Sequence, residues 1–77
     1  MNFEMWVRAL KAARAGAGVS QEGLAGLVKW SPSLIAAIET GRRRPTMEFA
    51  VAADEALGTG GLLAGLLREH EGERTPS

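Results

Sequence analysis

The chain has 77 residues, with nine basic and nine acidic side chains and no cysteine. A chain of this length forms at most one small domain with limited buried area, which leaves little room for a deep catalytic cleft. The absence of cysteine excludes disulfides and thiolate metal sites, and the single histidine, His70, cannot complete a zinc site. We therefore expect a protein that is not an enzyme and that has no metal and no cofactor.

No apolar run approaches the roughly 20 residues that are needed to cross a bilayer. The N-terminal stretch is interrupted by charges from Glu4 onward, so it does not have the pattern of a signal peptide. We expect a cytoplasmic protein that does not interact with a membrane.

Charge is distributed unevenly, although the formal net charge is zero. Residues 1–45 hold seven basic side chains against three acidic ones, a net charge of +4, and residues 46–77 hold two against six, a net charge of −4. This asymmetry is typical of a molecule with one basic face toward nucleic acid and an acidic far side. An ordinary solvated surface gives the same counts, so charge alone does not decide the partner.

Apolar residues recur at three- and four-residue steps along nearly the whole chain, and no alternating strand pattern occurs. The pattern predicts an all-α domain of five short helices, over residues 3–15, 21–28, 32–40, 47–57 and 62–70. Ser20, Ser31 and Thr46 are the predicted N-caps of the second, third and fourth helices, and Pro32 starts the third. The first helix is expected to end before Gly16.

Several residues have more than one interpretation. We expect Trp6 and Trp30 to be core residues rather than platforms for base stacking. The leucines of residues 62–70 either cover the first helix as domain core or form a dimer seam. Asp54 and Glu55 are interpreted as a solvated helix face rather than an acid/base pair.

The two short helices over 21–28 and 32–40, joined by a tight turn at Lys29 and Trp30, predict a helix-turn-helix. In this motif the second helix enters the major groove of DNA by its N-terminal end, and the first helix crosses the phosphate backbone. An ordinary amphipathic hairpin of a small helical domain is the alternative reading of these two helices.

The segments "GVSQEGLAGLV", "WSPSLIAAIETGRRRP" and "FAVAADEALGTGGLLAGLL" resemble the lambda-repressor-like (Xre-type) helix-turn-helix domain, in particular that of actinobacterial regulators with a larger C-terminal domain. The resemblance covers about residues 5–68. It implies a bacterial, sequence-specific transcriptional regulator, such as a repressor, that binds double-stranded DNA. It also implies a homodimer on two half-sites about 34 Å apart.

The resemblance also implies which side chains meet DNA. Gln21 begins the first helix of the motif, Ser33 lies at the groove end of the second, and three arginines follow in a loop near the DNA backbone. The complete predicted DNA-binding set is Gln21, Lys29, Ser31, Ser33, Ala36, Ala37, Thr40, Arg42, Arg43 and Arg44. Arg14 and Glu39 match positions that in relatives form a buried ion pair between the first and third helices.

The sequence departs from the family at the turn and on the recognition helix. Lys29 stands where a glycine often makes the turn, so a strained left-handed lysine is expected there. The outward stripe of the recognition helix holds Ala36 and Ala37, where relatives carry longer polar side chains. Alanine can touch a thymine methyl group but offers no hydrogen bond to a base edge.

These departures leave a second function open. A protein-interaction module, or an antitoxin-like repressor, would use the same fold to bind a partner protein. The two alanines and the neutral net charge favour this alternative, whereas the arginine loop favours DNA. Residues 1–70 are assigned to the domain, and residues 71–77 to a disordered polar tail or to the start of a linker to a C-terminal effector domain.

Overall fold

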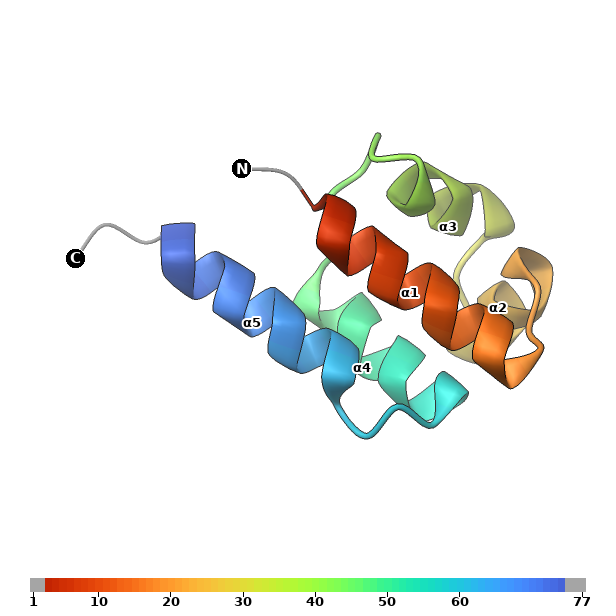
Figure 1. The fold of residues 1–77 in the computed structure, drawn as a ribbon. Coiled ribbons are helices and arrows are strands. Elements are labelled where there is room, and N and C mark those ends of the chain that lie inside the picture. The colour runs from red at the N-terminus through yellow and green to blue at the C-terminus, as the bar shows by residue number, and fades with distance from the viewer. Residues whose placement is uncertain (1–2, 75–77) are drawn as a thin grey trace.

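The computed structural model describes residues 3–74, and the side chains of that range up to residue 69. Within this range the chain forms five α-helices and no strand, which confirms the predicted all-α fold. The helices are α1 (Glu4–Ala17), α2 (Gln21–Val28), α3 (Pro32–Glu39), α4 (Met47–Leu57) and α5 (Leu62–Arg74). α1 crosses the middle of the domain and packs against α3 on one side and against α4 and α5 on the other (Figure 1).

The predicted capping residues begin α2, α3 and α4. The hydroxyls of Ser20, Ser31 and Thr46 each accept a hydrogen bond from the backbone N–H three residues further on, at 2.9, 3.2 and 3.1 Å. Each bond satisfies one of the N–H groups that a helix start leaves without an intrahelical partner. Pro32 occupies the first turn of α3, as predicted.

Two predicted helix ends are wrong. α1 continues through Gly16 to Ala17. Gly18 is its C-cap, and its left-handed conformation (φ 70°) lets its N–H donate to the carbonyl of Ala15. α5 continues to Arg74, so residues 71–74, which we expected in a disordered tail, are helical. Once a helix exists, each added residue gains a backbone hydrogen bond, and glutamate and arginine are good helix formers.

The core is formed by one face of every helix. Its largest fully buried side chains are Phe49, Leu10, Leu24, Ile35, Ile38, Leu63 and Leu67. Trp6 is buried and its indole N–H donates to the carbonyl of Leu63 at 2.9 Å, which ties α1 to α5. Trp30 is half-buried, and its ring forms a T-shaped contact with Phe49, with 5.5 Å between the ring centroids. Both tryptophans are therefore core residues, as the sequence predicted.

The leucines of α5 divide between core and surface. Leu63 and Leu67 are fully buried and Leu66 is half-buried against the core, whereas Leu62 is 49% exposed. The interpretation as domain core therefore holds for Leu63, Leu66 and Leu67. Leu62 does not face inward.

The interpretation of Asp54 as part of a solvated helix face is wrong. Asp54 is only 5% exposed, and its carboxylate accepts hydrogen bonds from the N–H groups of Leu63 and Ala64, each at 2.8 Å, and from the hydroxyl of Thr59. It therefore caps the start of α5 from α4. Glu55 is exposed, as predicted.

Lys29 has φ 64° and ψ 35° and is the one described non-glycine residue with a positive φ. This left-handed conformation brings Cβ close to the carbonyl oxygen and costs roughly 1–2 kcal/mol for a non-glycine residue. The expected strained turn at Lys29 is confirmed.

Replacing Lys29 with glycine is expected to stabilise the domain by about 0.5–1 kcal/mol, because removal of Cβ relieves the backbone strain. The greater entropy of the unfolded glycine variant offsets part of that gain. Lys29→Ala loses the same charge but keeps Cβ, and should give no such gain. Urea unfolding followed by tryptophan fluorescence measures both changes. Equal stability of the two variants would contradict a backbone origin of the effect.

Candidate nucleic-acid interface

α2 and α3 pack against each other and are joined by a turn of three residues. The N–H of Trp30 donates to the carbonyl of Ala25 at 3.1 Å, which closes the end of α2 over the left-handed Lys29. Because the Trp30 ring also rests on Phe49 of α4, the direction in which α3 leaves the turn is fixed by the core. The two helices thus form a rigid helix-turn-helix.

The surface of α3 presents short side chains. Ser33 and Thr40 are exposed, whereas Ala36 and Ala37 are half-buried. The Thr40 hydroxyl donates to the carbonyl of Ala37 at 3.2 Å, and the Ser31 hydroxyl is engaged as the N-cap. The helix therefore offers a surface that a base pair can approach closely, with few long hydrogen-bonding groups.

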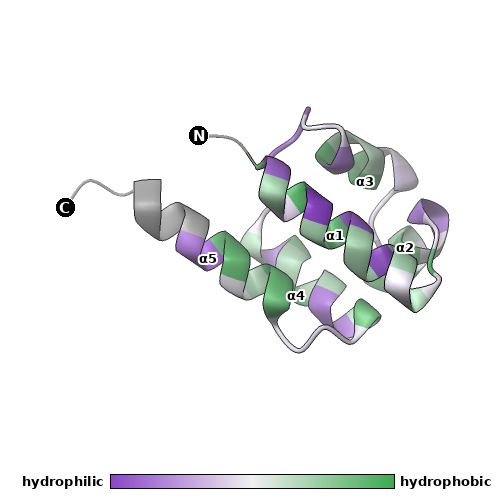
Figure 2. Ribbon diagram, viewed as in Figure 1, coloured by the Kyte–Doolittle hydropathy of each residue, from purple (hydrophilic) through white to green (hydrophobic). Residues whose placement is uncertain are grey.

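The loop after α3 holds three consecutive exposed arginines, Arg42, Arg43 and Arg44, and is hydrophilic in Figure 2. Gly41 at φ 81° reverses the chain, and the N–H groups of Arg42 and Arg43 both donate to the carbonyl of Ala37, at 2.9 and 3.2 Å. These bonds fix the start of the loop to the end of α3. The start of the arginine loop therefore lies next to the end of α3.

An ion pair connects α1 to the end of α3. Arg14 donates from Nε and Nη2 to the two carboxylate oxygens of Glu39, at 2.9 and 3.0 Å, and from Nη1 to the carbonyl of Val19 at 3.1 Å. The side chains of Arg14 and Glu39 are 19% and 2% exposed. Gln21 adds a hydrogen bond to Glu39 at 2.9 Å, so the start of α2 joins the same cluster.

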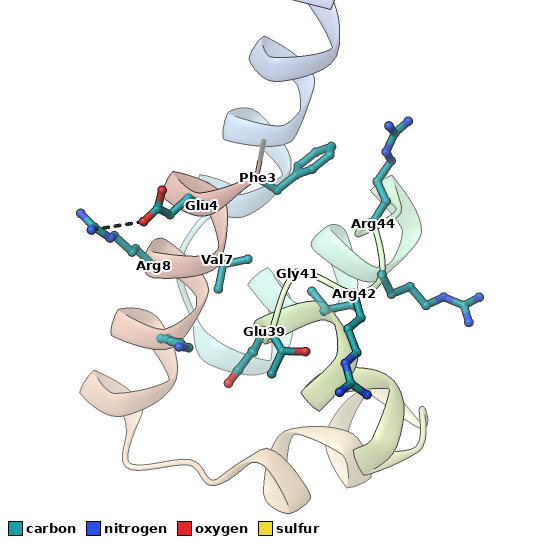
Figure 3. Close-up of a pocket in the computed structure, with 12 residues that line it drawn as sticks. Phe3, Glu4, Val7, Arg8, Glu39, Gly41, Arg42 and Arg44 are labelled. Atoms are coloured by element: carbon teal, nitrogen blue, oxygen red, sulfur yellow. Dashed lines mark ion pairs between the residues drawn. The ribbon is translucent and has the colours of Figure 1, made fainter. Parts of the chain in front are cut away.

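A groove of about 660 Å³ separates the N-terminal half of α1 from the arginine loop (Figure 3). Arg8 and Lys11 line one wall, so α1 adds basic groups that we did not predict as site residues. Glu4 lies 3.5 Å from Arg8 in an exposed pair on α1. The basic surface is therefore wider than the predicted DNA-binding set.

Two of the residues that line the groove, from segments distant in sequence, contact each other. The guanidinium of Arg44 lies over the ring of Phe3, 5.4 Å from its centroid. Phe3 is the first residue of the predicted helix over residues 3–15. No local sequence pattern predicts the contact of Phe3 with Arg44, because 40 residues lie between them in the sequence.

The structure brings the predicted residues together only in part. Ser33, Thr40 and the three arginines are exposed on α3 and the loop that follows it. Gln21 is half-buried, and its amide N–H is directed to Glu39. Lys29 is exposed at the turn.

The described residues 3–69 include no cluster of three or more metal-ligating side chains. In the part of the chain that the structure describes, no helix combines the length and the apolar character that crossing a membrane requires.

An all-α domain with a rigid helix-turn-helix followed by a basic loop belongs to the class of DNA-binding domains. The family model described as "Helix-turn-helix domain" matches residues 7–67, and the chain belongs to this family. The predicted resemblance to this type of domain is confirmed, and the fold and the match agree with an Xre-like domain. Domains of this family act in DNA-binding regulators and are typically not enzymes. No curated protein and no solved structure gives a significant match to the chain.

Proposed function

We propose that this domain is the sequence-specific DNA-binding part of a bacterial transcriptional repressor of the Xre type. α3 enters the major groove, and the arginine loop contacts phosphates beside it. Ser33, Ala36, Ala37 and Thr40 face the bases, so reading relies on close apolar fit and short hydroxyls. Gln21, Lys29 and Ser31 lie at the edges of this surface and complete the proposed contact set.

The observation that carries the proposal is the fixed junction between α3 and the loop. Because the N–H groups of Arg42 and Arg43 bind the carbonyl of Ala37, the basic loop and the recognition helix form one surface. Phosphate contacts set the register and supply most of the affinity, and the base contacts then set specificity.

The rest of the proposal follows from the resemblance. The domain, which includes α5, binds as a homodimer to two half-sites about 34 Å apart. We propose a cytoplasmic protein without enzymatic activity. We also propose that its nearest relatives within the family are the DNA-binding domains of actinobacterial regulators.

Arg43→Ala is expected to weaken binding to all duplex sequences alike, because phosphates carry no sequence information. The plot of log affinity against log salt concentration should become shallower by about 0.9, the value for one phosphate contact. Fluorescence anisotropy with a mixed-sequence duplex, titrated at several salt concentrations, measures both changes.

Arg68→Ala is the matched control, since Arg68 is exposed on α5 and its loss changes the net charge equally. This variant should keep the wild-type salt slope. The proposal fails if the wild-type domain does not bind duplex DNA at low salt, or if its binding does not depend on salt.

A protein-interaction module is the second candidate function; an antitoxin-like repressor would combine partner binding with DNA binding and would therefore also shift with DNA. Ala36 and Ala37 on α3 favour the interaction module, because alanine offers no hydrogen bond to a base edge. Size-exclusion chromatography with and without duplex DNA separates the two functions. A DNA-binding domain shifts in elution volume with DNA, whereas an interaction module does not.

A further inference from the structure

Phe3 and Arg44 join the start of α1 to the arginine loop. Phe3 is half-buried and packs against the hydrophobic core, and its carbonyl accepts the N–H of Val7 at 2.8 Å as part of the first turn of α1. The backbone of Phe3 is therefore part of the first turn of α1, and its ring packs beside the core. The guanidinium of Arg44 lies 5.4 Å from the ring centroid, and Figure 3 shows the two side chains facing each other at the end of the groove.

We propose that Phe3 is a positioning residue for DNA binding, which holds Arg44 in the orientation that meets a phosphate. The inference rests on the proposed function, since it assigns Arg44 a phosphate contact.

A guanidinium is planar and interacts with an aromatic ring through its face. Its five N–H donors lie in the plane, so contact with the ring leaves donors at the edge for a phosphate. An arginine that is already ordered loses less side-chain entropy when DNA binds. The contact with Phe3 therefore converts a flexible exposed side chain into a prepared phosphate ligand.

Arg42 and Arg43 provide an internal comparison. They are exposed in the same loop, but among the described residues neither has an aromatic ring contact of this kind. Substitution of Phe3 should therefore act through Arg44 and not through its neighbours.

The test is a double-mutant cycle measured by fluorescence anisotropy with a mixed-sequence duplex. Phe3→Leu keeps an apolar side chain against the core but removes the aromatic face. It should weaken binding about three- to tenfold, which corresponds to the entropy cost of ordering one side chain, that of Arg44, on binding. Phe3→Tyr keeps the ring and should keep the affinity. In an Arg44→Ala background Phe3→Leu should have no further effect, whereas in an Arg43→Ala background its full effect should remain.

Circular dichroism melting of each variant establishes that it is folded at the assay temperature. A second measurement is independent of DNA: the NMR shifts of the Arg44 side chain should carry a ring-current contribution that Phe3→Leu removes and Phe3→Tyr keeps.

The inference is overturned if the effects of Phe3→Leu and Arg44→Ala multiply, or if Phe3→Tyr binds as weakly as Phe3→Leu. In either case salt-dependent binding by the wild-type domain leaves the proposed function intact. Absence of any DNA binding overturns both, and the NMR shifts then report only whether the contact exists.

Discussion

Replacing Arg14 with alanine is expected to destabilise the domain by about 3–5 kcal/mol, because it leaves the charge of Glu39 buried without its cationic partner. Glu39 has a side chain only 2% exposed, and after the substitution only Gln21 would still donate to its carboxylate. A domain of this length has a total stability of about 4–12 kcal/mol. The loss is therefore a large fraction of the total, and it unfolds the domain if the total lies at the lower end of that range.

Urea unfolding at 25 °C, followed by circular dichroism, measures the loss. Arg8→Ala is the matched control on the same helix, since the Glu4–Arg8 pair at 3.5 Å has side chains 68% and 77% exposed. An exposed pair of this spacing contributes about 0.3–0.5 kcal/mol. Arg14→Lys keeps the charge but loses the two parallel hydrogen bonds, so it should fold with an intermediate loss.

The combination Arg14→Met with Glu39→Leu tests the physical reason. Removing both charges leaves no unpaired ion, so the double variant should recover much of the stability that Arg14→Ala loses. If Arg14→Ala costs no more than Arg8→Ala, the cluster does not hold α1 to α3 as inferred.

Asp54→Ala is expected to cost about 2–4 kcal/mol, the second large effect. The carboxylate accepts two backbone N–H groups at the start of α5 and the hydroxyl of Thr59, and alanine leaves all three without this acceptor. Hydrogen bonds to a charged group are worth about 1.5–3 kcal/mol, and the loss of an N-cap costs about 0.5–2 kcal/mol. The negative charge also interacts favourably with the helix dipole.

Hydrogen exchange locates the effect in the chain. In Asp54→Ala the amides of Leu63 and Ala64 should exchange faster relative to those of α2, because their acceptor is gone. Glu55→Gln, one residue away and exposed, should change stability by no more than about 0.5 kcal/mol. Wild-type stability and protection in Asp54→Ala would show that α5 does not depend on this cap.

Sequence reasoning was most successful where the signal is local. The N-caps Ser20, Ser31 and Thr46 each bond a group three residues away, and their roles follow from residue type and position. The strained turn at Lys29 follows from a non-glycine residue at a position that requires positive φ. Local rules of this kind determined the five helices and, through the spacing of α2 and α3, the class of domain.

Tertiary structure decided the partners of side chains that act at a distance. Asp54 looks like a surface acid in the sequence, and it is buried only because α5 folds back onto α4. Gln21 donates its amide N–H to Glu39, a contact that the sequence did not predict. The contact of Phe3 with Arg44 joins the start of α1 to the arginine loop. Caps and helical periodicity depend on neighbours within about four residues, so the sequence by itself determined the helices. The contacts of Asp54, Gln21 and Phe3 form only when the helices pack, so the tertiary structure decided them.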